Sequence, residues 1–177
     1  MQPVSRDTFG PLIAFLLPGF VVLWGLQAYS PTLTQWLSPL GSTLPTIGGF
    51  LFATLASTAA GLIVSAIRWV IIDTLYHHTG IPPPQWNLHR LPQVLDTFES
   101  FVEAHYHFYQ FYANMLMALL VVYVVQLVAT ERIPWPLVAS DYVLLSICLI
   151  LILGSRDSLQ KYYRRTEAVL NPRKNAK

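Results

Sequence analysis

Two pairs of side chains in this sequence have the spacing that metal binding or proton transfer requires. An acid and a histidine stand four residues apart at Asp73 and His77, and again at Glu103 and His107. On a helix this spacing puts both members on one face, so two such pairs on neighbouring helices could supply four ligands. Because carboxylate and imidazole groups suit zinc or iron, these four residues are a candidate metal site.

A longer polar stripe contains the second of these pairs. At about 100° per residue, its members fall within an arc of about 80° on one helix. They are Asp96, Glu99, Glu103, His107, Gln110 and Asn114. Polar groups at membrane depth are costly and often mark a pathway, so the stripe is a candidate pore lining or partner surface, together with Arg68. The alternative is a solvated helix face whose last two amides form hydrogen bonds between helices.

The elements that must position these groups are membrane spans. Of the 177 residues, 54% are hydrophobic and 11% are charged, against about a quarter charged in an average globular domain. Four windows have the roughly 20 apolar residues that a hydrocarbon core of about 30 Å requires. They are residues 11–29, 47–67, 108–129 and 133–153. We therefore predict an all-α polytopic membrane protein with four transmembrane helices.

The charges predict its orientation. Ten of the eleven Lys and Arg residues lie at the two termini or between the second and third spans, and Arg132 alone lies on the other side. The positive-inside rule then places both termini in the cytoplasm, in a multi-pass protein of the cell's inner membrane. Residues 74–107 become a cytoplasmic loop with a helical hairpin extension, and residues 155–177 a basic cytoplasmic tail.

The second span carries a packing signal. Small residues recur in steps of four and form what we call the helix-packing seam: Gly49, Ala53, Ser57, Gly61 and Ser65. Such a strip lets another helix approach closely, either within one chain or between copies of it. Arg68 follows at the end of this span, where its side chain is expected to extend to the headgroups or, alternatively, to pair with an acid of the third span.

Proline and glycine predict where helices end or bend. Pro18 and Gly19 predict a kink in the first span, and residues 30–46 read as irregular structure. Gly80 and the prolines after it end the second helix. From Pro92 to Ala129 nothing interrupts a helix, so one long rod is expected there.

The tail predicts contact with lipid. Lys161, Arg164 and Arg165 stand beside two tyrosines just beyond the last span, a composition that suits anionic headgroups. Nucleic acid is the alternative partner of such a patch, but cationic residues behind a span follow from topology, and none is expected.

The functional hypothesis that follows is non-enzymatic. The chain is expected to be a homo-oligomeric membrane component that forms a pore or anchors a cytoplasmic protein partner, among membrane lipids and without a cofactor. The alternative is a metal-dependent enzyme at the cytoplasmic face using Asp73, His77, Glu103 and His107. A small-solute transporter is third, since four spans show no inverted repeat.

Overall fold

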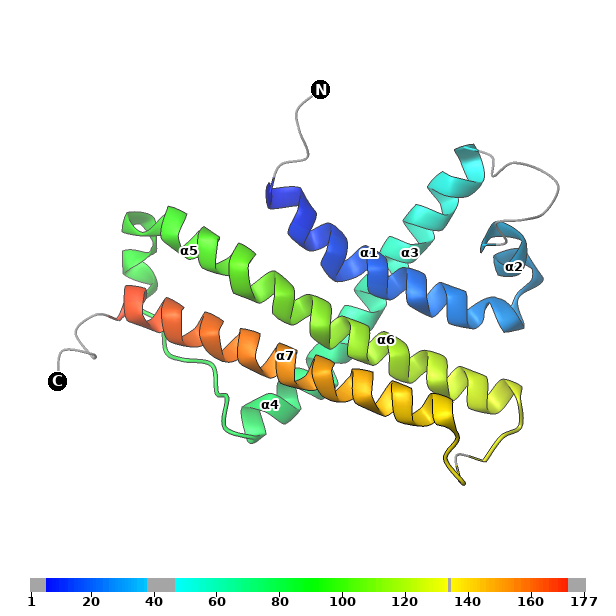
Figure 1. Ribbon diagram of the computed structural model, residues 1–177. Coiled ribbons are helices and arrows are strands. Elements are labelled where there is room, and N and C mark those ends of the chain that lie inside the picture. Colours follow the sequence, from blue (N-terminus) through cyan, green and yellow to red (C-terminus); the bar gives the residue numbers. More distant parts are fainter. Residues whose placement is uncertain (1–5, 38–46, 134, 172–177) are drawn as a thin grey trace.

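The computed structural model describes residues 6–37, 47–133 and 135–171, and every regular element in these ranges is helical. Four helical stretches are long and apolar enough to cross a membrane. They are Leu12–Tyr29, Gly48–His78, Leu95–Ala129 and Ala139–Leu170. Successive stretches run in alternate directions (Figure 1). The predicted fold class is confirmed: the chain is all-α, with four helices of transmembrane length.

The helices follow one another with few breaks. The first part of the chain forms α1 (Arg6–Leu26), a 3₁₀ turn (Gln27–Tyr29) and α2 (Pro31–Leu37). The second long stretch is α3 (Ile47–Arg68), a π-helical turn (Trp69–Asp73) and α4 (Thr74–His78). The third is α5 (Leu95–Phe101), a second π-helical turn (Val102–Tyr106) and α6 (His107–Ala129), preceded by a 3₁₀ turn (Leu88–Gln93). The last is α7 (Ala139–Leu170).

The loop after the first span corrects one prediction. Residues 31–37 are helical rather than irregular, because Ser30 caps the helix: its Oγ accepts the Leu33 N–H at 3.3 Å, and its carbonyl accepts the Thr34 N–H at 3.0 Å. Pro31 occupies the first helical position, where its missing N–H leaves no bond unmade. The remainder of that loop, residues 38–46, lies outside the described residues. α1 continues through Pro18 and Gly19 to Leu26, and the kink there stays a prediction.

Polar residues set the start of α7. The Asp141 carboxylate accepts the Val138 N–H at 2.9 Å and pairs with Arg132. An acid in the first turn of a helix also meets the positive end of its dipole. α7 then continues for 32 residues, so residues 155–170 of the predicted tail are helical and continue the span.

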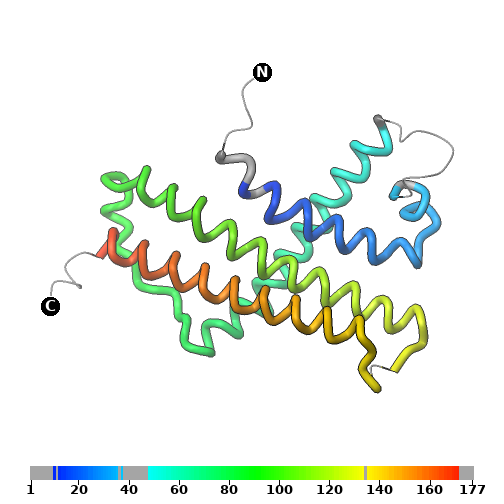
Figure 2. The backbone as a smooth tube through the Cα atoms, viewed as in Figure 1, coloured from blue at the N-terminus to red at the C-terminus, as the bar shows by residue number. Residues whose placement is uncertain are grey.

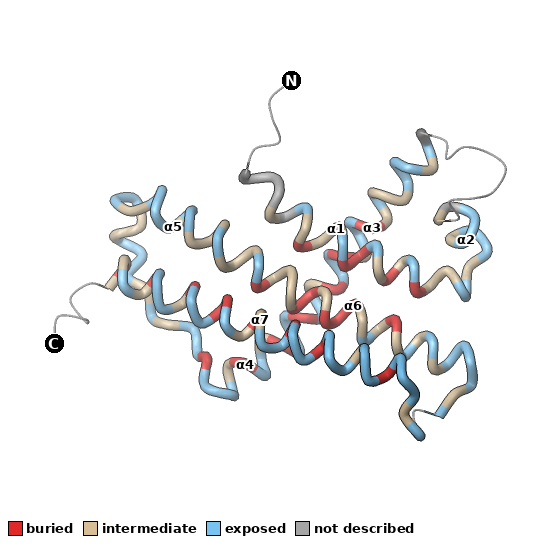
Figure 3. The backbone as a smooth tube through the Cα atoms, in the orientation of Figure 1, coloured by how far each residue is buried: buried red, intermediate tan, exposed pale blue. Residues whose placement is uncertain are grey.

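The third long stretch is the centre of the molecule. α1, α3 and α7 each pack against α6, which lies between α1 and α7. The backbone trace shows α7 running antiparallel beside α6, and α3 crossing behind α1 (Figure 2). Buried residues gather where α1, α3 and α6 cross (Figure 3). They include Ala14, Ser57, Ala113 and Asn114.

Glycine permits the closest of these crossings. A Cβ on Gly19 of α1 would overlap the Ser57 carbonyl of α3, and a Cβ on Gly61 of α3 would overlap the Phe15 carbonyl of α1. The two backbones therefore touch, which any side chain at either glycine would prevent. This contact fixes the position of α1 between α3 and α6.

The outward surface of the helices is apolar. Large hydrophobic side chains with half or more of their area exposed lie all along α3 and the first half of α7; among them are Phe50, Leu55, Ile63, Val143 and Ile150. A soluble protein rarely exposes contiguous apolar surface of this extent. The surface instead suits hydrocarbon, as the span lengths do.

One end of the molecule extends past the apolar windows. Residues 155–170 of α7 lie against α5 and the second π-helical turn, and we call these two antiparallel segments, 95–106 and 155–170, the stalk. The connecting loop 79–94 is fixed to it. Trp86 of that loop packs against Phe98, Tyr162 and Tyr163 with ring centroids 5.8–6.4 Å apart. Asn171 also bonds this loop, donating to the Gln85 carbonyl at 2.6 Å.

Candidate functional site

A buried ion pair lies at the end of the second span. Arg68 is 3% exposed, and its Nη1 lies 3.1 Å from the Asp73 Oδ1. Residues five apart on an α-helix point about 140° from each other. The π-helical turn between them has i to i+5 geometry and brings both side chains to one face. The expectation that Arg68 extends to the headgroups is therefore wrong, and its acid partner is on its own helical stretch.

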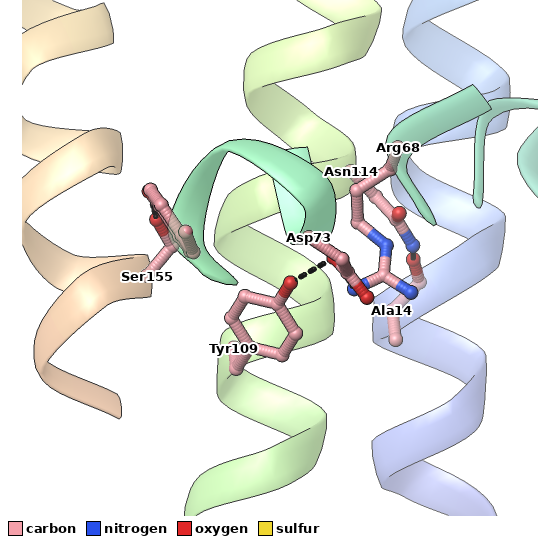
Figure 4. A network of polar contacts seen from close by, with 7 residues as sticks. Ala14, Arg68, Asp73, Tyr109, Asn114 and Ser155 are labelled. Carbon is pink, nitrogen blue, oxygen red and sulfur yellow. Dashed lines mark hydrogen bonds and ion pairs between the residues drawn. The ribbon is translucent and has the colours of Figure 1, made fainter. Parts of the chain in front are cut away.

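Tyr109 of α6 completes this cluster. Its hydroxyl donates a hydrogen bond to the Asp73 Oδ1, and the Arg68 guanidinium carbon lies 5.0 Å from the centroid of its ring (Figure 4). The tyrosine is 1% exposed. A buried charge is tolerated when it is paired and hydrogen-bonded. The phenol provides one further bond for the carboxylate and a π face for the cation.

Asn114, one and a half turns further along α6, bonds the backbone of α1. Its Nδ2 donates to the Ala14 carbonyl at 2.8 Å (Figure 4). In a helix that carbonyl would accept the N–H of residue 18, but residue 18 is proline and has none. Asn114 therefore satisfies a carbonyl that Pro18 leaves without its helical donor. The side chains of Asn114 and Pro18 are both fully buried. An unsatisfied polar group costs the most free energy in such an interior.

Two further contacts join the second span to α7. The Tyr76 hydroxyl lies 2.6 Å from the Ser155 Oγ and donates to the Ile152 carbonyl at 3.3 Å. Arg156 donates to the Thr79 carbonyl at 2.8 Å and to its Oγ1 at 3.1 Å. These bonds connect the end of the second span to α7 at the side of the molecule that carries the stalk. The connection is made through α4 and the residue after it.

The predicted polar stripe does not lie along one surface. Asp96 and Glu99 are exposed on the stalk, Glu103 and Gln110 are half-buried, and Asn114 is fully buried. The ring of His107 packs over Gly10 of α1, where a Cβ would overlap its Nδ1. The π-helical turn at 102–106 places one more residue in that turn than an α-helix holds, so the helical wheel drawn across it is out of register.

The four predicted metal ligands do not form a metal-binding group in the described part of the chain. Among residues 6–37, 47–133 and 135–171, no three His, Cys, Asp or Glu side chains lie close enough together to share a metal ion. The Asp73 carboxylate instead binds Arg68 and Tyr109. His77 is half-buried on α4, and Glu103 and His107 belong to the central rod.

The helix-packing seam lies partly at an internal crossing. Ser57 and Gly61 are buried against α1, whereas Gly49, Ala53 and Ser65 are half-buried. The basic residues of the predicted lipid contact lie on the stalk part of α7. Lys161, Arg164 and Arg165 are all exposed there, and the Lys161 Nζ lies 2.6 Å from the Asp157 Oδ2.

Reasoning from the sequence missed Tyr109 and Tyr76. On a wheel that assumes an unbroken α-helix, Tyr109 lies on the side opposite the polar stripe, and Tyr76 lies outside both the stripe and the acid–histidine pairs. Nothing in the sequence marks a π-helical turn. The sequence feature that could have indicated this ion pair is an arginine and an aspartate five residues apart at the end of an apolar run.

The buried groups of this site come from four helical stretches and bond one another. We compared the chain with known proteins. No protein-family model, curated protein or solved structure matches it.

Proposed function

We propose that the chain is an integral membrane component of the cytoplasmic membrane, with both termini in the cytoplasm, and that its stalk anchors a cytoplasmic protein partner. The observation that carries this is the stalk itself. At about 1.5 Å per residue, its two segments extend about 18 and 24 Å beyond the apolar windows. That distance exceeds the headgroup layer, which adds about 5–7 Å on each side of the core.

The stalk is also held rigid, which supports a docking role. The aromatic cluster around Trp86, the Asn171 bond to Gln85 and the Arg156 bonds to Thr79 all fix the connecting loop to it. Because these groups are already held in place, the stalk would lose less conformational entropy when a partner binds. The exposed carboxylates of Asp96 and Glu99 near the tip give a partner charges to recognise.

The pore version of the hypothesis has less support. Of the groups expected to line a pore, Asn114 bonds Ala14 and Arg68 pairs with Asp73, so both serve the interior of a single chain. The metal-dependent alternative has no three ligands together in the described part of the chain. Homo-oligomerisation stays a proposal. Lys161, Arg164 and Arg165 lie midway along the stalk, and we propose that their long side chains extend back toward anionic headgroups.

The test is co-purification in mild detergent. We expect a soluble protein to co-purify stoichiometrically with the wild type and to be lost from the double variant Asp96→Lys/Glu99→Lys. The matched control is Glu131→Lys, an exposed acid beyond the other end of α6. The proposal fails if the tip variant keeps its partner. It also fails if liposomes with the purified protein conduct ions above empty ones, which would favour the pore.

A further inference from the structure

An apolar groove of about 440 Å³ runs along one side of α7. Its walls come from three places: the π-helical turn with α4, the middle of α6, and the first half of α7. On α7 the lining residues Leu144, Cys148 and Ile152 recur every four residues, so the groove follows that helix. From Asp141 to Ile152 it extends about 16 Å.

The two ends of the groove differ in charge. At one end Asp141 is neutralised by Arg132 and accepts the Val138 N–H. At the other end stand Tyr76 and Ile152, and Arg156 follows one helical turn later with its guanidinium carbon 5.9 Å from the Tyr76 ring centroid. One end is therefore closed by an ion pair, and the other, toward the stalk, carries a cation.

The hydrogen bonds described for Arg156 all go to neutral acceptors. It is half-buried and donates to the carbonyl and hydroxyl oxygens of Thr79. The ion pairs found in the described residues use Arg68, Arg132 and Lys161 instead. A guanidinium at the edge of the hydrocarbon region with neutral partners is suited to a phosphate, which it binds through two parallel N–H donors.

We propose that the groove holds one acyl chain of an anionic glycerophospholipid, whose phosphate lies beside Arg156. The length of the groove matches about half of a hydrocarbon core, one leaflet, with the phosphate at the stalk side. The lining of the groove is almost entirely apolar. It therefore suits a hydrocarbon chain and not a polar solute, which would find too few hydrogen-bond partners there. This site is separate from the tip of the stalk and does not depend on the anchoring role.

The charge at the mouth is tested by lipid binding. Purified protein in detergent is titrated with phosphatidylglycerol or phosphatidylcholine of identical acyl chains, and bound lipid is counted by native mass spectrometry. The wild type should prefer phosphatidylglycerol, and Arg156→Gln should reduce that preference about tenfold, as loss of a charge-assisted contact predicts. Thr79→Val, which removes one contact of Arg156 but keeps the charge, should retain the preference.

The groove itself is tested through Cys148, which is 8% exposed. Bound phosphatidylglycerol should slow the alkylation of its thiol by N-ethylmaleimide, and should no longer do so in Arg156→Gln. Cys148→Trp should abolish retention of either lipid, whereas Ile150→Trp, at a position 67% exposed, should not. If Cys148→Trp does not fold, the alkylation experiment decides. The proposal is overturned if the wild type holds both lipids equally, if Arg156→Gln binds as the wild type does, or if lipid leaves the thiol reactivity unchanged.

Discussion

Pro18 and Asn114 are coupled although they lie on different helices and 96 positions apart in the chain. The proline removes an N–H from α1, and the amide of α6 supplies one to the same carbonyl. The bond therefore has two roles: it satisfies a buried acceptor and it holds α1 against α6. Its energy depends on which residue stands at position 18.

That dependence can be measured with a double-mutant cycle. Asn114→Leu should destabilise the protein by about 1–2 kcal/mol, because the Ala14 carbonyl loses its donor in a dry interior. In a Pro18→Ala background the restored backbone N–H can bond that carbonyl, so Asn114→Leu should cost less. Thermal unfolding in detergent of the four proteins gives the coupling energy. Equal effects of Asn114→Leu in both backgrounds would contradict this account.

At the level of single residues, the sequence predicted the polar groups better than their partners. The alternative in which Asn114 bonds between helices agrees with its bond to the Ala14 carbonyl, but nothing in an apolar window says which carbonyl lacks a donor. Arg68 was expected to extend to the headgroups or to pair with an acid of the third span, and it instead pairs with Asp73 of its own helical stretch. The pairing depends on a π-helical turn that composition does not reveal.

At the level of elements, the contact between α1 and α3 depends on glycine. Gly61→Ala should destabilise the protein by about 1–3 kcal/mol, since the added methyl group overlaps a backbone carbonyl that cannot move alone. Gly48→Ala is the matched control on the same helix, where a Cβ would have nothing within 4 Å. That change should be neutral or stabilising, as alanine favours helix. Thermal unfolding of both variants in detergent measures the difference.

The outcome also bears on self-association through the helix-packing seam. If Gly61 serves only the internal crossing, Gly61→Ala lowers stability without changing the protomer number at a given detergent concentration. A variant as stable as the wild type but with a changed protomer number would instead show that the seam joins copies.

The existence and order of the four long helices could be predicted because hydrophobic length determines them. The ends of the helices differ from the predicted windows. Ser30 and Pro31 carry a capping signature, although residues 30–46 were predicted to be irregular. Arg156 and Asp157 do not stop a helix, because both tolerate helical geometry and the following residues pack against α5.

At the level of the whole molecule, the orientation in the membrane is a prediction from charge. Single cysteines placed in a Cys148→Ser background can test it with a membrane-impermeant maleimide on intact cells. Ile133→Cys, at a position 75% exposed between the last two spans, should be labelled from outside. Asp96→Cys on the stalk should react only after the membrane is permeabilised. The reverse pattern would place the stalk and both termini outside.

The bond between Asn114 and the Ala14 carbonyl also limits how such a chain can change by descent. A proline arriving first at position 18 would leave a dry carbonyl unsatisfied, whereas an asparagine arriving first at position 114 can bond a carbonyl of its own helix meanwhile. The asparagine is therefore the permissive step, and once the proline is present neither residue can be lost alone without penalty. The two positions should be inherited as a unit.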